Sequence, residues 1–220
     1  MHKPFEDYLE AGQRQVWASL RSPSAIQDYL DALPYSVEPA NRCPLRVLQD
    51  GQANCFDGAL FAAAALRRLG YLPRLVDLWP APNSDDEHII AIYRRAGGLG
   101  ALAKSNFVGL RWREPVYRSL RELVMSYFDF YYNVAGQKTL RAYSLPVALE
   151  PLDYLNWMVD DAALPAIFER LERRRRVPVL SAAMIAGLSP VDSLSYRAGL
   201  LAADRAGLYQ PATASEVAAP

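Results

Sequence analysis

The 220-residue sequence has no excess of either charge, no long apolar run and very few cysteines and histidines. Its 24 lysines and arginines balance its 24 aspartates and glutamates, which excludes a general electrostatic attraction to nucleic acid or to an anionic membrane surface. No stretch approaches the roughly 18 uninterrupted apolar residues of a membrane span, and the N-terminal sequence MHKPFEDYLEAGQRQ has no apolar signal-peptide core. We therefore expect a soluble, cytoplasmic protein that binds neither nucleic acid nor membrane.

The two cysteines, Cys43 and Cys55, are too few for a disulfide framework. A structural zinc site needs about four ligands, and the sequence has no Cys-x-x-Cys pair and only one histidine, His88, besides the N-terminal His2. The acidic residues 85–87 are expected to form a solvated turn instead of a site for a hard cation. We predict that the protein needs no metal and no cofactor.

The composition is that of an ordinary globular protein. Hydrophobic residues make up 51% of the chain and charged residues 22%, and a chain of this length fits one core. We predict a single compact domain in three parts: N-terminal helices over 1–44, a core over 45–115 and a helical C-terminal extension over 116–212.

Apolar spacing and turn residues predict the individual elements. Helices are predicted at 4–20, 22–33, 54–70, 116–133, around 155, at 163–176 and at 195–207; strands at 73–79, 88–94 and 100–107; a short extended piece at 45–48; and a frayed tail at 212–220. The arginine run 173–176 is expected to be a solvated helix end. The aromatic run 127–132 either lines a substrate groove or, at helical spacing, belongs to the core.

Cys55 directly follows Asn54, a plausible N-cap, and precedes an alanine-rich helical sequence. Unpaired backbone N–H groups and the helix dipole favour an anion at this position, so they would stabilise a thiolate. The alternative is that Cys55 is a small apolar core residue. Cys43, next to a proline and with no histidine nearby in the sequence, is expected to be a spectator thiol, with a Cys43–Cys55 disulfide as a minor redox alternative.

A thiol nucleophile needs a base, and the base needs an orienting group on its other nitrogen. His88 opens the second predicted strand, and Ser105 and Asn106 lie on the third, where either side chain could face the imidazole across the hairpin. The alternative is a structural histidine bonded to the acidic turn. For the oxyanion, backbone N–H groups at the helix start, that of Cys55 included, are the economical donors, with Gln52 or Gln49 as side-chain candidates.

The segments NCFDGALFAAAALRRLGYLPRLV, EHIIAIY and GALAKSN resemble, in this order, the transglutaminase-like superfamily, which shares its thiol-protease geometry with papain-like enzymes. The resemblance covers roughly residues 45–115. The later sequence LRWREPVYRSLRELVMSYFDFYYNVAGQKTLRAYS resembles an extension found in an uncharacterised bacterial subgroup. The resemblance implies an α+β, transglutaminase-like or papain-like cysteine-protease fold, with helices flanking a small antiparallel sheet.

It also implies the roles of the residues. Cys55 would be the nucleophile, His88 the general base, and Asn106 or Ser105 the third member of a catalytic triad. Most transglutaminase-like enzymes have an aspartate in the third position, and this sequence has no acid there. Papain-like enzymes use an asparagine, because the imidazole needs orientation more than extra charge.

We therefore expect a cysteine hydrolase or acyltransferase that acts on an amide bond of a peptide or protein substrate. The alternative is an inactive member of the same fold that binds a peptide or a protein.

Overall fold

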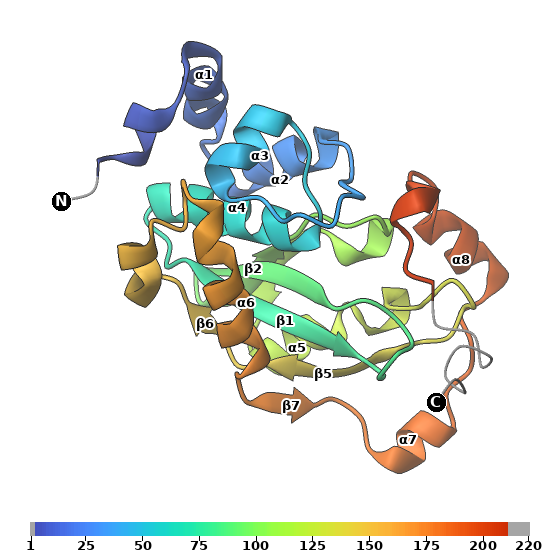
Figure 1. The fold of residues 1–220 in the computed structure, drawn as a ribbon. Helices are drawn as coiled ribbons and strands as arrows, with labels where there is room; N and C mark the ends of the chain where they lie inside the picture. Colours follow the sequence, from blue (N-terminus) through green and yellow to red (C-terminus); the bar gives the residue numbers. More distant parts are fainter. Residues whose placement is uncertain (1–2, 211–220) are drawn as a thin grey trace, which may run out of the picture.

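The computed structural model describes residues 3–210, which form a twisted antiparallel sheet with helices on both faces (Figure 1). The strands are β1 Arg74–Pro80, β2 His88–Arg95, β3 Gly98–Leu102, β4 Arg113–Tyr117, β5 Leu140–Ser144, β6 Val147–Ala148 and β7 Arg176–Pro178. Within the described residues the sheet is seven-stranded, in the order β4-β3-β2-β1-β5-β7, with β6 also paired to β1.

Eight α-helices and several 3-10 turns are found in the same part of the chain. The α-helices are α1 Ala11–Ser19, α2 Pro23–Ala32, α3 Pro44–Asp50, α4 Cys55–Arg68, α5 Leu120–Met125, α6 Leu164–Glu172, α7 Ala182–Ala186 and α8 Ser193–Gly199. The 3-10 turns are η1 Phe5–Tyr8, η2 Val108–Leu110, η3 Phe128–Phe130, η4 Glu150–Leu155, η5 Asp161–Ala163 and η6 Arg205–Gly207. No helix of residues 3–210 has the length and apolar content to cross a membrane.

The central strands β1 and β2 are buried on both faces because each face of the sheet has its own core. Leu75 and Ile89 pack in the larger core with α4, whereas Val76 and Ile90 pack in a second core with α5. Since side chains alternate along a strand, His88 points to the same face as Ile90. The mixed helical and antiparallel architecture agrees with the predicted α+β class.

The predicted helix after Asn54 and the three predicted strands are confirmed as α4, β1, β2 and β3. The serine cap at the start of the second helix is confirmed too, since the Ser22 side chain accepts a hydrogen bond from Ala25 N. The predicted extended piece at 45–48 is wrong: Pro44 starts a helix there and Gly51, with φ of 64°, ends it.

Strand β3 stops at Leu102, although the sequence predicts a strand to residue 107. The chain leaves the sheet because Lys104 turns toward the end of α2, where its ammonium group donates to the carbonyl oxygens of Leu30, at 2.8 Å, and of Leu33. A cation at a helix C-terminus satisfies carbonyl groups that have no partner within the helix. Ser105 and Asn106 therefore lie in a loop.

The long helix predicted at 116–133 is also wrong. Its first residues belong to β4, Ser119 caps the short helix α5, and the aromatic residues that follow fold into η3 and buried loop positions. The region predicted as a helical extension contains helices and also supplies β5, β6 and β7 to the sheet. The predicted frayed tail lies outside the described residues.

Asp77 is a carboxyl group inside the core. It is 1% exposed, and neither of its side-chain oxygens has a hydrogen-bond partner among the described residues. Burial and the nearby Glu87 carboxylate raise the pKa of Asp77 from 3.8 to about 8. The folded protein therefore carries a proton on Asp77 at neutral pH.

Replacing this carboxyl by a neutral group of the same shape, Asp77→Asn, should change how stability depends on pH. Between about pH 4 and 8 the folded protein binds a proton that the unfolded chain has released, so this contribution to stability is present at low pH and lost as pH rises. The free energy of unfolding of the variant, relative to the unaltered protein, should rise by up to ~1.4 kcal/mol per pH unit in this interval. Urea denaturation at several pH values measures it, and a difference independent of pH would contradict the raised pKa.

Candidate active site

Helix α4 begins at Cys55 because Asn54 caps it. The Asn54 side chain accepts a hydrogen bond from Asp57 N at 2.9 Å, and the Asp57 carboxylate accepts one from Asn54 N at 3.3 Å. Asp57 is fully buried and also accepts from the backbone N–H of Arg42 at 2.7 Å. This capping box fixes the backbone at the helix end where N–H groups lack intrahelical partners. The predicted Asn54 cap is confirmed.

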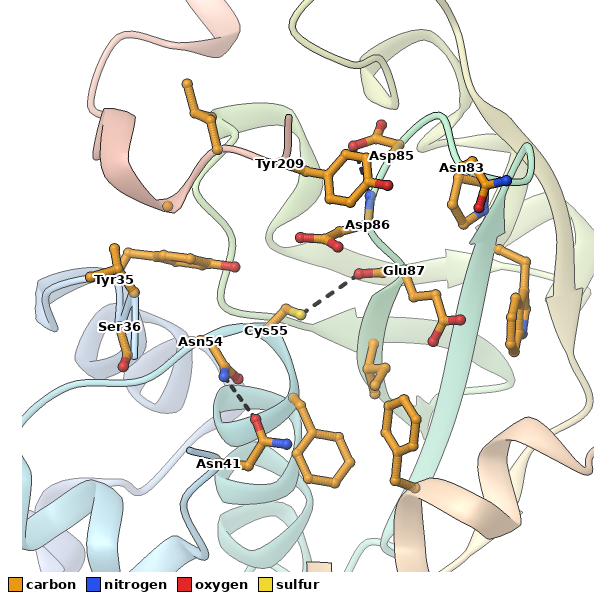
Figure 2. Close-up of a pocket in the computed structure, with 18 of the residues that line it drawn as sticks. Tyr35, Ser36, Asn41, Asn54, Cys55, Asn83, Asp85, Asp86, Glu87 and Tyr209 are labelled. Atoms are coloured by element: carbon orange, nitrogen blue, oxygen red, sulfur yellow. Dashed lines mark hydrogen bonds between the residues drawn. The ribbon is translucent and has the colours of Figure 1, made fainter. Parts of the chain in front are cut away.

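The partly exposed Cys55 thiol lies beside the start of β2. Its Sγ donates a weak hydrogen bond to the Glu87 carbonyl oxygen at 3.8 Å (Figure 2). The Tyr35 side chain, from the loop after α2, points at Cys55 from the other side (Figure 2). Burial raises the pKa of the Tyr35 hydroxyl, and the neighbouring Cys55 adds to this increase.

His88 is the first residue of β2 and only 4% exposed. Its Nε2 is 2.7 Å from the carbonyl oxygen of Leu110 in η2. A carbonyl oxygen only accepts, so Nε2 carries the proton and donates it, and in the neutral ring Nδ1 is left as the basic nitrogen. The rings of Tyr127 and Tyr131 pack edge-on against the imidazole, with centroids 6.4 and 6.5 Å away.

Cys55 and His88 line the same small cavity of about 50 Å³, together with Ser105 and Asn106. Cys55 also lines an open cleft of about 910 Å³. Figure 2 shows this cleft, with the acidic turn Asp85–Glu87 on one side of the thiol and Tyr35 on the other. The structure therefore brings the predicted nucleophile, base and orienting candidates to one place.

The hydrogen bonds of the other predicted residues lead away from His88. The Ser105 hydroxyl accepts from Phe107 N at 3.0 Å, and the Asn106 amide binds the backbone of Asp204. In the described chain it is the Leu110 carbonyl that binds the imidazole, and the orienting role of Asn106 or Ser105 stays a prediction. Gln52 donates to Glu38 at 3.2 Å and lines neither the cavity nor the cleft, so its oxyanion role also stays a prediction.

Burial raises the pKa of the Cys55 thiol to about 12. The backbone N–H of Ile89 opposes this increase, whereas the carboxylates of Asp86, Asp57 and Asp77 add to it. Burial also lowers the pKa of His88 to about 4, against the hydrogen bond from the ring to Leu110. At neutral pH the resting pair is therefore a neutral thiol and a neutral imidazole, not an ion pair.

In the acidic turn, Asp86 is exposed as expected for a solvated turn, whereas Asp85 and Glu87 are partly buried. Asp85 is half-buried and accepts a hydrogen bond from the Thr139 hydroxyl at 2.7 Å. Burial raises the pKa of Asp85 to about 6 and also raises the pKa values of Asp86 and Glu87. These carboxyl groups give the cleft beside Cys55 a negative potential, which disfavours a thiolate there.

Cys43 is buried at the start of α3, and burial raises the pKa of its thiol to about 12. Both cysteines are free in the structure. Among residues 3–210, no group of three or more His, Cys, Asp or Glu residues is arranged to hold a metal ion.

Sequence reasoning missed two groups at the site. Tyr35 follows a proline at the end of a helix, and nothing in its spacing connects it to Cys55. Leu110 acts through its backbone carbonyl, a group that every residue has, so its identity carries no signal.

No family model matches the sequence, and no curated protein matches it. Among solved structures, two of Legionella pneumophila LapG are similar to this chain. One is 12% identical with a TM-score of 0.35 and covers 45% of this chain and 68% of LapG. The other, of EGTA-treated LapG, is 12% identical with a TM-score of 0.41 and covers 73% of this chain and 92% of LapG. A likeness at these scores assigns neither a family nor an activity to the chain.

Proposed function

We propose that this protein is a cysteine-dependent hydrolase or acyltransferase of the transglutaminase-like type, acting on an amide bond of a peptide or protein. The observation that carries the proposal is one cavity lined by both Cys55, at the start of a buried helix, and His88, whose proton is fixed on Nε2. The open cleft next to this cavity offers room for a polypeptide.

In the proposed reaction, His88 acts as a general base. Nδ1 takes the thiol proton as Sγ of Cys55 bonds to the acyl carbon, and the carbonyl π electrons move to the oxygen. When the tetrahedral intermediate collapses, the C–N bond breaks and the leaving amine takes the proton from Nδ1. Water or an amine then attacks the thioester carbon while Nδ1 takes its proton. The C–S bond breaks, the acyl product is released, and Sγ takes the proton from Nδ1, which restores the thiol.

The tetrahedral oxyanion needs donors that are already in place. The backbone N–H of Cys55 is one candidate, and the Tyr35 hydroxyl, on a side chain that points at Cys55, is a second (Figure 2). A contribution from Gln52 would require its side chain to leave Glu38. The carbonyl of Leu110 orients His88 in the resting site, and Asn106 or Ser105 would have to exchange partners to take over that role.

A second candidate function is that of a non-catalytic peptide- or protein-binding module on the same fold. The neutral resting forms of Cys55 and His88 favour this alternative, because they lack the preformed thiolate–imidazolium pair of papain-like enzymes. Thiol reactivity separates the two candidates.

Alkylation of Cys55 by iodoacetamide, in a Cys43→Ser background, should be slow at neutral pH and should accelerate steadily between about pH 6 and 10, because the resting thiol is protonated. His88→Ala should slow the reaction at pH 7 by about tenfold or more, since Nδ1 no longer accepts the thiol proton. Mass spectrometry of the modified peptide gives the rates.

A fast plateau at acidic pH would contradict the neutral resting pair. Rates that are equal with and without His88, in variants with unchanged circular dichroism, would refute the enzyme and leave the binding module.

The negative charge of the acidic turn should itself slow the alkylation of the Cys55 thiol. Asp86→Asn removes the carboxylate that contributes most among the acidic neighbours to the raised pKa of Cys55, so alkylation at about pH 8 should become about threefold faster. Asp129→Asn is the matched control, because Asp129 is exposed, pairs with Lys138 and lines neither the cavity nor the cleft. An equal effect of both substitutions would show that the acceleration reflects net charge alone.

A further inference from the structure

The segment from Asp204 to Tyr209 passes over the proposed active site. Gly207 and Tyr209 line both the small cavity that holds Cys55 and His88 and the open cleft beside it. Figure 2 shows the Tyr209 ring next to Asp85 and Asp86, across the cleft from Tyr35. A part of the chain far from Cys55 in sequence thus occupies space where a substrate of the proposed reaction would lie.

Asn106 holds this segment by its backbone. Its Nδ2 donates to the carbonyl oxygen of Asp204 at 2.7 Å, and its Oδ1 accepts from the N–H of the same residue, also at 2.7 Å. The Asn106 side chain is almost wholly buried, with 8% exposure for the residue. An amide that pairs with both backbone groups of one residue recognises a polypeptide without reading its side chain.

The contact continues from Asn106 to Cys55. Gly207 lies so close to its neighbours that a Cβ atom there would be 2.9 Å from the Tyr35 ring and 3.1 Å from Nδ2 of Asn106. The side chain of that same Tyr35 points at Cys55 (Figure 2). The segment therefore packs directly behind the side chain that covers the nucleophile.

We infer that this edge of the small cavity is a binding site for polypeptide backbone, with Asn106 as its clamp, and that residues 204–209 occupy the place of the substrate in the resting protein. The inference rests on the proposed function and narrows its substrate to a polypeptide that pairs with Asn106 near the reacting bond. The segment must leave before such a substrate can pair with Asn106, so the chain itself blocks this backbone-binding site in the resting protein.

Two substitutions open the site in different ways. Gly207→Val displaces the segment by steric conflict with the Tyr35 ring and with Nδ2 of Asn106 but keeps the Asn106 amide, whereas Asn106→Ala releases the segment and removes that amide. In a Cys43→Ser background, iodoacetamide should alkylate Cys55 at least threefold faster in both variants than in the protein with Gly207 and Asn106 unchanged. Both variants should also show faster backbone hydrogen exchange over residues 204–209. Gly187→Val is the control, because the nearest atoms to a Cβ at Gly187 lie at 3.8 Å.

A synthetic peptide with the sequence of residues 203–210, ADRAGLYQ, then tests the clamp. Added at millimolar concentration, it should protect Cys55 from alkylation in the Gly207→Val protein and not in the Asn106→Ala protein. Asn106→Asp, which keeps the shape and replaces the N–H donor by an oxygen facing the Asp204 carbonyl, should behave like Asn106→Ala and serves if that variant fails to fold.

Unchanged rates of alkylation and hydrogen exchange in both the Gly207→Val and the Asn106→Ala proteins would overturn the inference that residues 204–209 block the site in the resting protein. Equal protection by the peptide with and without the Asn106 amide, or no protection in either variant, would overturn the clamp. These outcomes can be distinguished from failure of the proposed chemistry. Protection of Cys55 by the peptide needs no base, so it tests only the peptide-binding site. Alkylation rates that do not depend on His88 would refute the enzymatic function and leave the peptide-binding site in place.

Discussion

The buried carboxylate of Asp57 is the interaction on which the site depends. It accepts hydrogen bonds from the backbone of Asn54 and of Arg42, and the Arg42 guanidinium lies 3.7 Å from it. Arg42 also binds Asp50 at the end of α3, so one carboxylate joins the start of α4 to α3 and to the loop before it. A buried charge of this kind is tolerated only when it is paired and hydrogen-bonded. Cys55 owes its position to that satisfied network, which sets the direction of the first turn of α4.

The burial that makes the site rigid also sets its protonation state. Burial around Cys55 and His88 disfavours their charged forms, so both rest neutral. The helix dipole favours a thiolate at Cys55, but burial and the nearby carboxylates outweigh it. A reaction at this site must therefore move the thiol proton during the attack itself. Binding of a substrate that excludes water and supplies positive charge beside the acidic turn would ease that transfer.

The sequence predicted what local signals determine. An asparagine before an alanine-rich helix marked the start of α4 at Cys55, and short apolar runs between turn residues marked β1, β2 and β3. Local signals could not predict that Ser105 and Asn106 lie in a loop. The chain leaves the sheet there because Lys104 caps the end of α2, about 70 residues earlier in the sequence. The partner of Asn106 is 98 residues away, and that of His88 is a backbone carbonyl. Neither contact has a residue-type pattern at fixed spacing, so only the assembled fold reveals it.

The aromatic residues after α5 show how the second core supports the site. The Tyr131 hydroxyl donates to the carbonyl oxygens of Leu78, at 3.0 Å, and of Asp86, at 2.7 Å, and so ties the end of β1 to the acidic turn. The Tyr127 hydroxyl donates to the carbonyl oxygen of Arg111, next to the residue that binds His88. Of the two interpretations of this aromatic run, groove wall or core, Tyr127 follows the second. Tyr131 is equally buried and also lines the small cavity of Cys55 and His88. Both tyrosines act on the chemistry indirectly: they hold the loop whose carbonyl decides which nitrogen of His88 is the base.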